Sequence, residues 1–366
     1  LHFKVIETTN EETTYNTLNS GGTYFILNYA KLPDLTNILA RFMTEQPCLV
    51  ILDESHYIKS ENSNRSMAAV SISHLPQLKL ILSGTPVPQE TEDLIPQFKF
   101  LYPEIPIQTR NVVEKLDKVF VRTTRNELGI DEGEFREIII PFSDNQRKIY
   151  NMLKDEIMMR YNTGFRREFV KIRQYVVLLM QLVSNPSLLI DRLDSIRGFP
   201  TELLMNLESN KIDQACKRAR ELASKGEKVI IWSSFVKNVE TIYEKLIDLG
   251  ARKIHGGVGY VERGEIVNKF NYQPECSIVV INPMAGSEGI SLHHNCHRAI
   301  YVDRTFNVVH WLQSVDRIQR IGQKKTPIIE ILVHRRTIDD RIHNRLEEKI
   351  GKMAEILDDK SIKTEI

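Results

Sequence analysis

Two adjacent carboxylates, Asp53 and Glu54, directly follow the apolar run Cys48–Leu52. A short unbroken apolar run is typical of a strand buried on both faces of a parallel sheet, and ligands of such sheets bind beyond the carboxyl ends of the strands. A carboxylate at this place can hold the Mg²⁺ of a nucleotide, directly or through water. Its neighbour can orient or deprotonate the water that attacks a phosphoryl group. The simpler interpretation is a solvated turn with no chemical role.

Small hydroxyl residues follow the next apolar run, Leu78–Leu82. Ser83, Gly84 and Thr85 stand at the expected strand end and are followed by Pro86. Hydroxyl groups there can hydrogen-bond to the acidic pair and to a neighbouring domain. Either segment alone is compatible with an ordinary turn, but the two together at this spacing are far more specific.

A glycine-containing loop follows another expected strand, Ser277–Ile281. Gly286 and Gly289 flank a polar turn within residues 282–292. Glycine lets the backbone approach a phosphate or a ribose closely, so this loop is a candidate cofactor-binding segment. A pair of glycines is a weak signal by itself.

Arg317 and Arg320 lie three residues apart in a segment that is expected to be helical from Val308 to Arg320. Residues at this spacing share one face of a helix. Two fixed guanidinium groups on one face can grip a transferring γ-phosphoryl group. The simpler interpretation is a solvated basic helix end, which the helix dipole favours.

Apolar runs alternate with helical patterns at both ends of the chain, which predicts parallel sheets covered by helices. Residues 1–136 are expected to form one α/β domain, residues 137–209 a helical insert and residues 210–366 a second α/β domain. The insert begins with an extended segment over residues 138–142 and continues with long helices over residues 144–160 and 165–184. The predicted strands are Tyr24–Asn28, Cys48–Leu52, Leu78–Leu82, Val229–Ser233, Ala251–His255, Ser277–Ile281, Ala299–Val302 and Ile328–Val333.

The composition is that of an ordinary globular protein. Among 366 residues, 49 basic and 48 acidic side chains give a formal charge of +1, so the overall charge does not indicate a nucleic-acid partner. A local cluster is compatible with one, because residues 317–345 hold eight Lys and Arg against three Asp and Glu. The alternative for that cluster is a solvated helix face. No segment reaches the ~20 apolar residues of a membrane helix, and no membrane partner is expected.

Taken in order, these segments resemble the motifs of Swi2/Snf2-type ATPases of helicase superfamily 2. The resemblance covers nearly the whole chain from about Tyr24. The R-I-G-Q ending at residues 320–323, with Asp303 and Asn307 upstream, favours the Snf2 type over DEAD-box or restriction-type relatives. The D-E-S-H form of residues 53–56 is similar to compact annealing-helicase-type or bacterial and phage members. The matching segments are motif Ib at residues 24–32, motif II at 53–56, motif III at 83–86, motif IV at 228–235, a further block from 255 to 270, motif V at 285–292 and motif VI at 313–323.

The resemblance implies two RecA-like parallel-sheet lobes, the first incomplete, joined by a helical insert, with ATP and Mg²⁺ as cofactors. It implies that Asp53 binds the Mg²⁺ of ATP, that Glu54 orients water, and that Arg317 and Arg320 act as arginine fingers. Double-stranded DNA would lie across both lobes, held mainly by its phosphates. The implied site residues are Glu54, Arg317 and Arg320 for catalysis; Asp53, Gly286, Gly289 and Gln323 for cofactor binding; and Ser83, Gly84, Thr85, Ser233, His255 and Gly256 for coupling or DNA contact.

One departure from the family pattern is large: the 366 residues contain no G-x-x-x-x-G-K-[ST] phosphate loop. The Gly-Gly-Thr at residues 21–23 has no lysine and is no substitute. We therefore expect that the front of the first lobe, with the glutamine motif and motifs I and Ia, was truncated or is supplied by another polypeptide. This piece alone is then expected to hydrolyse little ATP. Smaller departures are Ser287 and Ser291 in motif V, and Phe306 and Val308 in the W-N-P element.

Two function classes stay open. The first is an ATP-driven translocase or remodeller of duplex DNA, strand-separating or strand-annealing, working alone or with other proteins of a DNA-processing complex. The second is a catalytically incomplete module that binds nucleic acid or protein. The missing loop favours the second class, while the retained Asp53, Glu54, Arg317 and Arg320 oppose it. A phosphate loop encoded upstream of Leu1 would decide for the first. The expected compartment is the cytoplasm of a prokaryotic or viral source, with the nucleus as the alternative.

Overall fold

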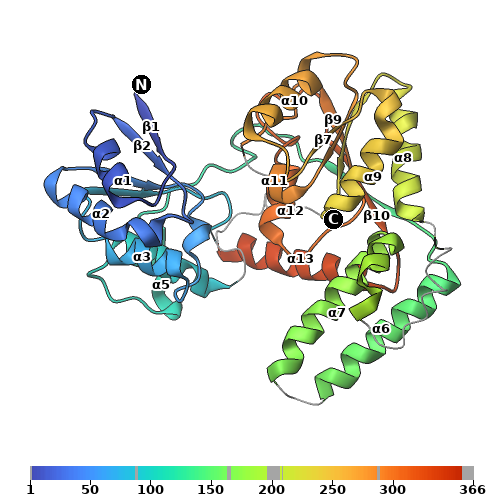
Figure 1. The fold of residues 1–366 in the computed structure, drawn as a ribbon, viewed down its shortest axis with the longest axis horizontal. Helices are drawn as coiled ribbons and strands as arrows, with labels where there is room; N and C mark the ends of the chain where they lie inside the picture. The colour runs from blue at the N-terminus through green and yellow to red at the C-terminus, as the bar shows by residue number, and fades with distance from the viewer. Residues whose placement is uncertain are drawn as a thin grey trace. The chain divides into compact units, whose positions relative to one another are not determined.

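The computed structural model describes residues 2–86, 90–162, 166–195, 207, 209–286 and 289–356. Contacts divide the chain into two compact units, residues 1–122 with 352–360 and residues 123–351 with 361–366. Both units combine parallel strands with helices, which confirms the expected α/β class (Figure 1). The three-part division at residues 136 and 209 stays a prediction. In the structure, residues 134–139 pair with the sheet of the second unit.

The first unit holds two pairs of parallel strands with helices between them. The strand-helix alternation expected from Tyr24 to Ile81 is confirmed. The strand formed by Phe3–Ile6 was not predicted, because a four-residue strand leaves little periodicity to detect. The strands are β1 (Phe3–Ile6) paired with β2 (Tyr24–Leu27), and β3 (Leu49–Leu52) paired with β4 (Leu78–Ile81). The helices are α1 (Glu11–Leu18), α2 (Leu32–Glu45), α3 (Asn64–Ser71), α4 (Leu94–Leu101) and α5 (Thr109–Asp117), with 3₁₀ turns η1 (Ser55–Ile58) and η2 (Thr91–Asp93).

Helix α2 illustrates how the sequence builds the core of this unit. Pro33 lies in its first turn, where the missing N–H removes no intrahelical bond. Leu35 and Leu39 are one helical turn apart and are both buried. They belong to the same apolar cluster as Leu52 of β3. The cluster therefore ties the helices to one face of the strands and holds the carboxyl end of β3 in place.

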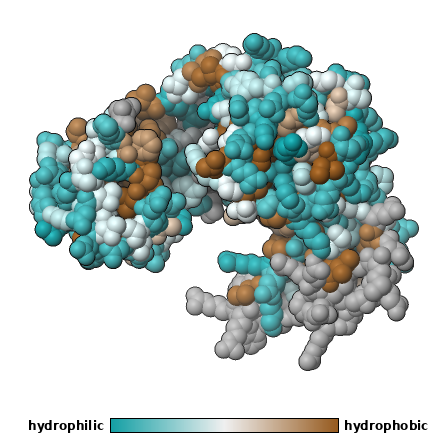
Figure 2. Space-filling model, turned by 45° about the horizontal axis from the view of Figure 1, so that its top comes forward, coloured by the Kyte–Doolittle hydropathy of each residue, from teal (hydrophilic) through white to brown (hydrophobic). Residues whose placement is uncertain are grey.

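The other face of these strands is exposed. Leu49 and Ile51 of β3 are 51% and 48% exposed, whereas Leu52 is buried. The expectation that residues 48–52 form a strand buried on both faces is therefore wrong for the described part of the chain, whose helices bury only the alternate side chains. Brown, apolar surface is visible on this unit in Figure 2. The other exposed apolar residues of the four strands are Phe3, Val5, Tyr24, Ile26, Leu78 and Leu80.

The second unit is built on a six-stranded sheet with all neighbours parallel, in the order β5-β10-β9-β6-β8-β7. Each strand predicted for this part of the chain is present within a few residues of its expected bounds. The strands are β5 (Glu134–Ile139), β6 (Lys228–Trp232), β7 (Arg252–Ile254), β8 (Ile278–Ile281), β9 (Cys296–Tyr301) and β10 (Ile328–Val333). The helices are α6 (Asp144–Asn162), α7 (Arg166–Ser184), α8 (Asn210–Ala223), α9 (Val236–Leu246), α10 (Tyr260–Tyr272), α11 (Pro283–Gly286), α12 (Val308–Val315) and α13 (Ile338–Ile356), with 3₁₀ segments η3 (Pro186–Ser195) and η5 (Ile247–Leu249).

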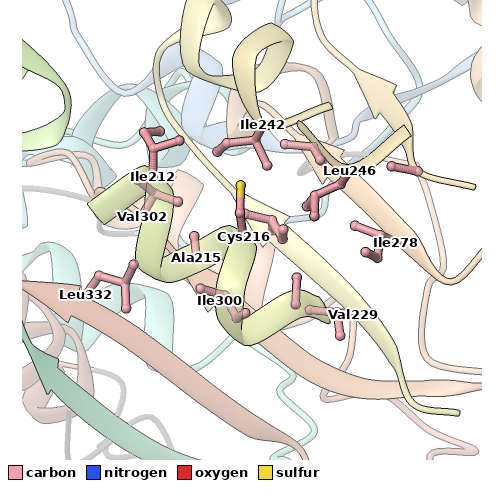
Figure 3. Packing of buried hydrophobic residues seen from close by; sticks show 14 of the residues in the cluster. Ile212, Ala215, Cys216, Val229, Ile242, Leu246, Ile278, Ile300, Val302 and Leu332 are labelled. Carbon is pink, nitrogen blue, oxygen red and sulfur yellow. The ribbon is translucent and has the colours of Figure 1, made fainter. Parts of the chain in front are cut away.

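The central strands of this sheet are buried on both faces. Every residue of β8 is buried, and so are the last four residues of β6. Figure 3 shows Ile212 and Cys216 of α8 and Ile242 of α9 packed with Val229 and Ile278 of the sheet. Complete burial of one such side chain stabilises the fold by roughly 1.5–3 kcal/mol, so this cluster gives the site loops at the strand ends a rigid base.

Two predicted elements differ from the structure in ways that affect the site. The extended segment expected over residues 138–142 is β5, which begins at Glu134 and forms the edge of the sheet beside β10. The helix expected from Val308 to Arg320 ends at Val315. No described helix is long and apolar enough to cross a membrane.

Candidate functional site

The two carboxylates lie on a tight turn between β3 and η1. Glu54 has φ 48° and ψ 53°, a left-handed conformation that is uncommon for a residue other than glycine. Asp53 is exposed, and its carboxylate oxygen Oδ1 accepts a hydrogen bond from the Glu54 N–H at 3.0 Å. The carboxyl group of Asp53 therefore keeps further lone pairs facing solvent. Such an oxygen fits Mg²⁺ or a water of its coordination shell.

Ser55 anchors the turn to the neighbouring strand and to α4. Its N–H donates to the carbonyl oxygen of Leu82 at 2.8 Å, and its hydroxyl donates to Oε1 of Gln97 at 2.6 Å. The amide of Gln97 in turn donates to the carbonyl oxygens of Pro86 and Asp93, each at 2.8 Å. Gln97 is buried. It was missed in the sequence because a lone Gln inside a helix carries no motif.

The predicted neighbour of the acidic turn, the Ser83–Thr85 loop, lies next to it. Nδ1 of His56 lies 3.2 Å from Oε2 of Glu54 and 3.5 Å from the hydroxyl of Ser83. The Ser83 hydroxyl accepts from the N–H of Thr85 at 3.1 Å. A Cβ added at Gly84 would meet no atom within 4 Å, so close packing does not require glycine there. The imidazole of His56 therefore lies between the two loops. The sequence had suggested a direct hydrogen bond from the hydroxyl residues to the acidic pair, and His56 carried no expectation.

Arg317 and Arg320 lie in the turns after α12 and do not share a helix face, which corrects the geometric basis of the prediction. They nevertheless meet at one carbonyl. Nη1 of Arg317 donates to the oxygen of Ile290 at 2.7 Å, and Nη1 of Arg320 reaches the same oxygen at 3.4 Å. Arg320 also donates to the hydroxyl of Ser291 at 2.8 Å. The glycine loop, rather than helical spacing, therefore brings the two guanidinium groups together.

The residues expected to bind the cofactor occupy their positions for different structural reasons. A Cβ on Gly286 would lie 2.2 Å from Cγ2 of Ile281, so packing against β8 excludes any side chain there. Gly289 has φ +71°, a conformation that favours glycine. The side-chain amide of Gln323 donates to the carbonyl oxygens of Cys296 and Ile318 at 2.9 and 3.0 Å. Gln323 therefore ties the end of motif VI to β9. Ser287 and Glu288 lie outside the described residues.

Ser233, expected to couple or contact DNA, is fully buried. Its hydroxyl donates to Oδ2 of Asp303 at 2.6 Å, and the hydroxyl of Ser184 donates to the same oxygen at 2.6 Å. The N–H of Ser234 donates to the other carboxylate oxygen at 2.7 Å. Asp303 thus joins the ends of α7, β6 and β9. A role of Ser233 in DNA contact can act only through its neighbours.

His255 and Gly256 lie at the end of β7. Nε2 of His255 is 2.8 Å from Oε1 of Glu240, and Nδ1 accepts from the N–H of Gly257 at 3.1 Å. Gly256 is exposed. Arg263 of α10 donates to the carbonyl oxygen of His255 at 3.2 Å and to that of Ala285 at 3.1 Å. This arginine therefore links the His255 loop with the start of the glycine loop.

Comparison with protein-family models agrees with the order of these segments. Residues 6–127 match the model described as an SNF2-related domain, and residues 210–322 match the helicase conserved C-terminal domain. The chain is a Snf2-type member of helicase superfamily 2. The acidic turn of this Snf2-type chain falls inside the first match, and both arginines fall inside the second.

Several curated proteins are similar to this Snf2-type chain at low sequence identity. It is similar to the chromatin remodeling factor mit1 of Schizosaccharomyces pombe, at 23% identity over 82% of this chain and 23% of that protein. It is also similar to the human DNA annealing helicase and endonuclease ZRANB3, at 22% identity over 88% of this chain and 31% of that protein. Among solved structures, the Sulfolobus solfataricus SWI2/SNF2 ATPase core in complex with dsDNA aligns over 99% of this chain and 78% of that chain, with 20% identity and a TM-score of 0.48. The chain spans less than two fifths of the length of the first curated relatives it matches.

Proposed function

We propose that this chain is the motor portion of an ATP-dependent enzyme that moves on, or remodels, duplex DNA. The observation that carries the proposal is the order of the two family matches, with Asp53 and Glu54 in the first and Arg317 and Arg320 in the second. These residue types suit metal binding, orientation of water and stabilisation of charge on a transferring phosphoryl group. Each of these roles is part of the proposal.

In this mechanism, Asp53 holds Mg²⁺, which when bound neutralises charge on the phosphates of ATP. The carboxylate of Glu54 accepts a hydrogen bond from the attacking water and orients it. His56, 3.2 Å from that carboxylate, fixes its direction. Arg317 and Arg320 donate to the oxygens on which charge develops, and the shared contact with Ile290 links that event to the glycine loop.

Duplex DNA is the proposed substrate surface, contacted mainly through its phosphates. The names of the relatives support this choice, since one is a DNA annealing helicase and another a chromatin remodelling factor. Other proteins of a DNA-processing complex belong to the same proposal. The compartment stays a prediction, the cytoplasm of a prokaryotic or viral source or, alternatively, the nucleus.

A second candidate function is a module that binds nucleic acid or protein without hydrolysing ATP. The observation in its favour is that the 366 residues contain no G-x-x-x-x-G-K-[ST] loop.

Phosphate release, measured with and without duplex DNA, separates the two candidates. The protein translated from its full natural reading frame is assayed beside residues 1–366 alone. DNA-stimulated release by the full protein supports the motor. DNA binding by a full protein that has no such release supports the second candidate. Robust turnover by residues 1–366 alone would contradict our account of the phosphate loop.

Glu54→Gln in the full protein tests the assigned chemistry. The substitution keeps size and hydrogen bonding but removes the charge that orients water, so nucleotide binding should persist while turnover falls at least ~100-fold. Glu61→Gln, at an exposed position of the same segment, is the matched control and should leave turnover unchanged. Turnover within about twofold of wild type, a barrier change of only ~0.4 kcal/mol, would show that Glu54 does not orient the water.

A further inference from the structure

The acidic turn needs support, because its backbone conformation is unfavourable. A non-glycine residue in the left-handed region is held there at a cost and persists only where its surroundings fix it. Among the described residues only Glu54 and Arg336 combine a side chain with a positive φ. Ser55 fixes the downstream side of the turn through Leu82 and Gln97. The upstream side is the peptide group of Asp53.

Tyr29, just beyond the end of β2, fixes that upstream side. Its hydroxyl donates to the carbonyl oxygen of Asp53 at 2.7 Å. Its ring lies 5.4 Å from the ring of Tyr57, and the Tyr57 ring stacks on His56 at 4.8 Å. His56 in turn contacts the carboxylate of Glu54. Tyr29 therefore reaches Glu54 by two routes, one through the backbone of Asp53 and one through the aromatic stack.

The phenol of Tyr29 is suited to hold this peptide group by a hydrogen bond. The carbonyl oxygen of Asp53 can only accept, and the Tyr29 hydroxyl, 2.7 Å away, supplies the donor.

We propose that Tyr29 is a positioning residue, which holds the Asp53 peptide so that Glu54 keeps its left-handed conformation and its carboxylate stays aimed at the attacking water. The inference deepens the proposed function and rests on it for its kinetic consequence. Its structural part, that one hydroxyl maintains the turn, is independent of any activity. Tyr29 lies 24 residues before Asp53 in the sequence, and the fold of the first unit brings its hydroxyl to the end of β3.

Tyr29→Phe is the direct test, because it removes the hydroxyl and keeps the ring in the stack. In the full protein we expect kcat to fall about tenfold while the KM for ATP changes less than twofold, since the loss concerns orientation rather than nucleotide binding. Tyr15→Phe is the matched control. The hydroxyl of Tyr15 donates to Oε2 of Glu45 at 2.9 Å in an exposed contact outside the motif segments, so the same substitution there should leave both constants unchanged.

A double-variant cycle distinguishes positioning of Glu54 from a general structural role. If Tyr29 acts through Glu54, Tyr29→Phe should lower the residual turnover of Glu54→Gln by less than twofold. The same tenfold loss in both backgrounds would overturn the inference, and so would unchanged kcat in Tyr29→Phe. A crystal structure of Tyr29→Phe gives an independent answer even if wild type proves inactive. Displacement of Glu54 from positive φ supports the inference, and an unchanged turn overturns it.

Discussion

At the scale of single residues, one main-chain oxygen brings two basic side chains of the second unit together. The carbonyl of Ile290 accepts from both Arg317 and Arg320, although neither arginine lies on a helix. The bond from Arg317 is short, at 2.7 Å, and the contact from Arg320 is longer, at 3.4 Å, so Arg317 couples the glycine loop to the arginines more strongly. Movement of that loop would carry the guanidinium groups with it.

Arg320→Ala tests the finger role in the full protein. If Arg320 stabilises charge on the γ-phosphoryl oxygens, turnover should fall on the order of 10³-fold, while ATP affinity and DNA affinity change far less. Arg320→Lys should rescue poorly, because an ammonium does not reproduce the planar fork. Ser291→Ala removes only the hydroxyl that accepts a hydrogen bond from Arg320, so turnover should fall less than about tenfold.

One other result would assign Arg320 a different role. Weakened DNA binding with a flatter salt dependence, together with normal turnover at saturating DNA, would make Arg320 a contact to the phosphate backbone. Arg317 would then be the next candidate for the finger.

At the scale of elements, buried polar contacts tie together segments that are distant in sequence. Lys211 of α8 is 1% exposed, and its ammonium lies 2.7 Å from Oδ2 of Asp339 on α13. The same carboxylate oxygen accepts from the N–H of His334, just after β10, at 2.8 Å. Asp303 joins α7, β6 and β9 in a similar way. The strand ends that carry the site loops are therefore held by buried charge as well as by apolar packing.

Lys211→Met should destabilise the second unit by about 3 kcal/mol, because Asp339 would keep a buried charge without its partner. Lys245→Met breaks the exposed pair with Asp213, whose atoms are 3.0 Å apart, and should cost less than about 1 kcal/mol. Urea unfolding followed by tryptophan fluorescence measures both. Trp232 and Trp311 are the two tryptophans of the chain, and both lie buried in this unit. Equal losses in the two variants would contradict the assigned role of the buried pair.

At the scale of the whole molecule, the second unit contains histidines whose pKa values differ between the folded and the unfolded state. Burial lowers the pKa of His334 from the ordinary 6.5 to about 3, and the nearby charge of Lys211 acts in the same direction. Nδ1 of His334 lies 2.9 Å from the carbonyl oxygen of Ile140. Burial also lowers the pKa values of His293 and His297. At a pH between the folded-state pKa and the unfolded-state pKa of these histidines, the unfolded chain binds more protons than the folded one.

The second unit should therefore lose stability as the pH falls below about 6.5. For His334 alone the loss is about 1.4 kcal/mol per pH unit, or roughly 2 kcal/mol from pH 6.5 to pH 5. Its contribution is fully present above pH 6.5 and declines as the pH falls towards 3. His334→Asn should flatten the pH dependence of tryptophan-detected urea unfolding, whereas His74→Gln, at an exposed position of the first unit, should not. An unchanged slope in His334→Asn would contradict the burial of a neutral imidazole.

The sequence by itself determined the class of the fold and the order of the site segments. Strand β10 matches its predicted bounds, Ile328–Val333, because its residues are apolar except for Glu330, as is typical of a strand buried on both faces. Asp53 and Ser83 could be placed at neighbouring strand ends because each directly follows a short, mostly apolar run. These features depend on local residue types, which the sequence displays directly.

Only the tertiary structure decided how the site side chains are held. The end of α12 at Val315, the burial of Ser233 and the shared contact of two arginines with Ile290 depend on residues far along the chain. The support of Glu54 by Tyr29 arises because the fold places the Tyr29 hydroxyl 2.7 Å from the carbonyl oxygen of Asp53. Such contacts leave no periodic signal in the sequence, since hydrogen bonds between distant residues require only that the fold place one donor beside one acceptor.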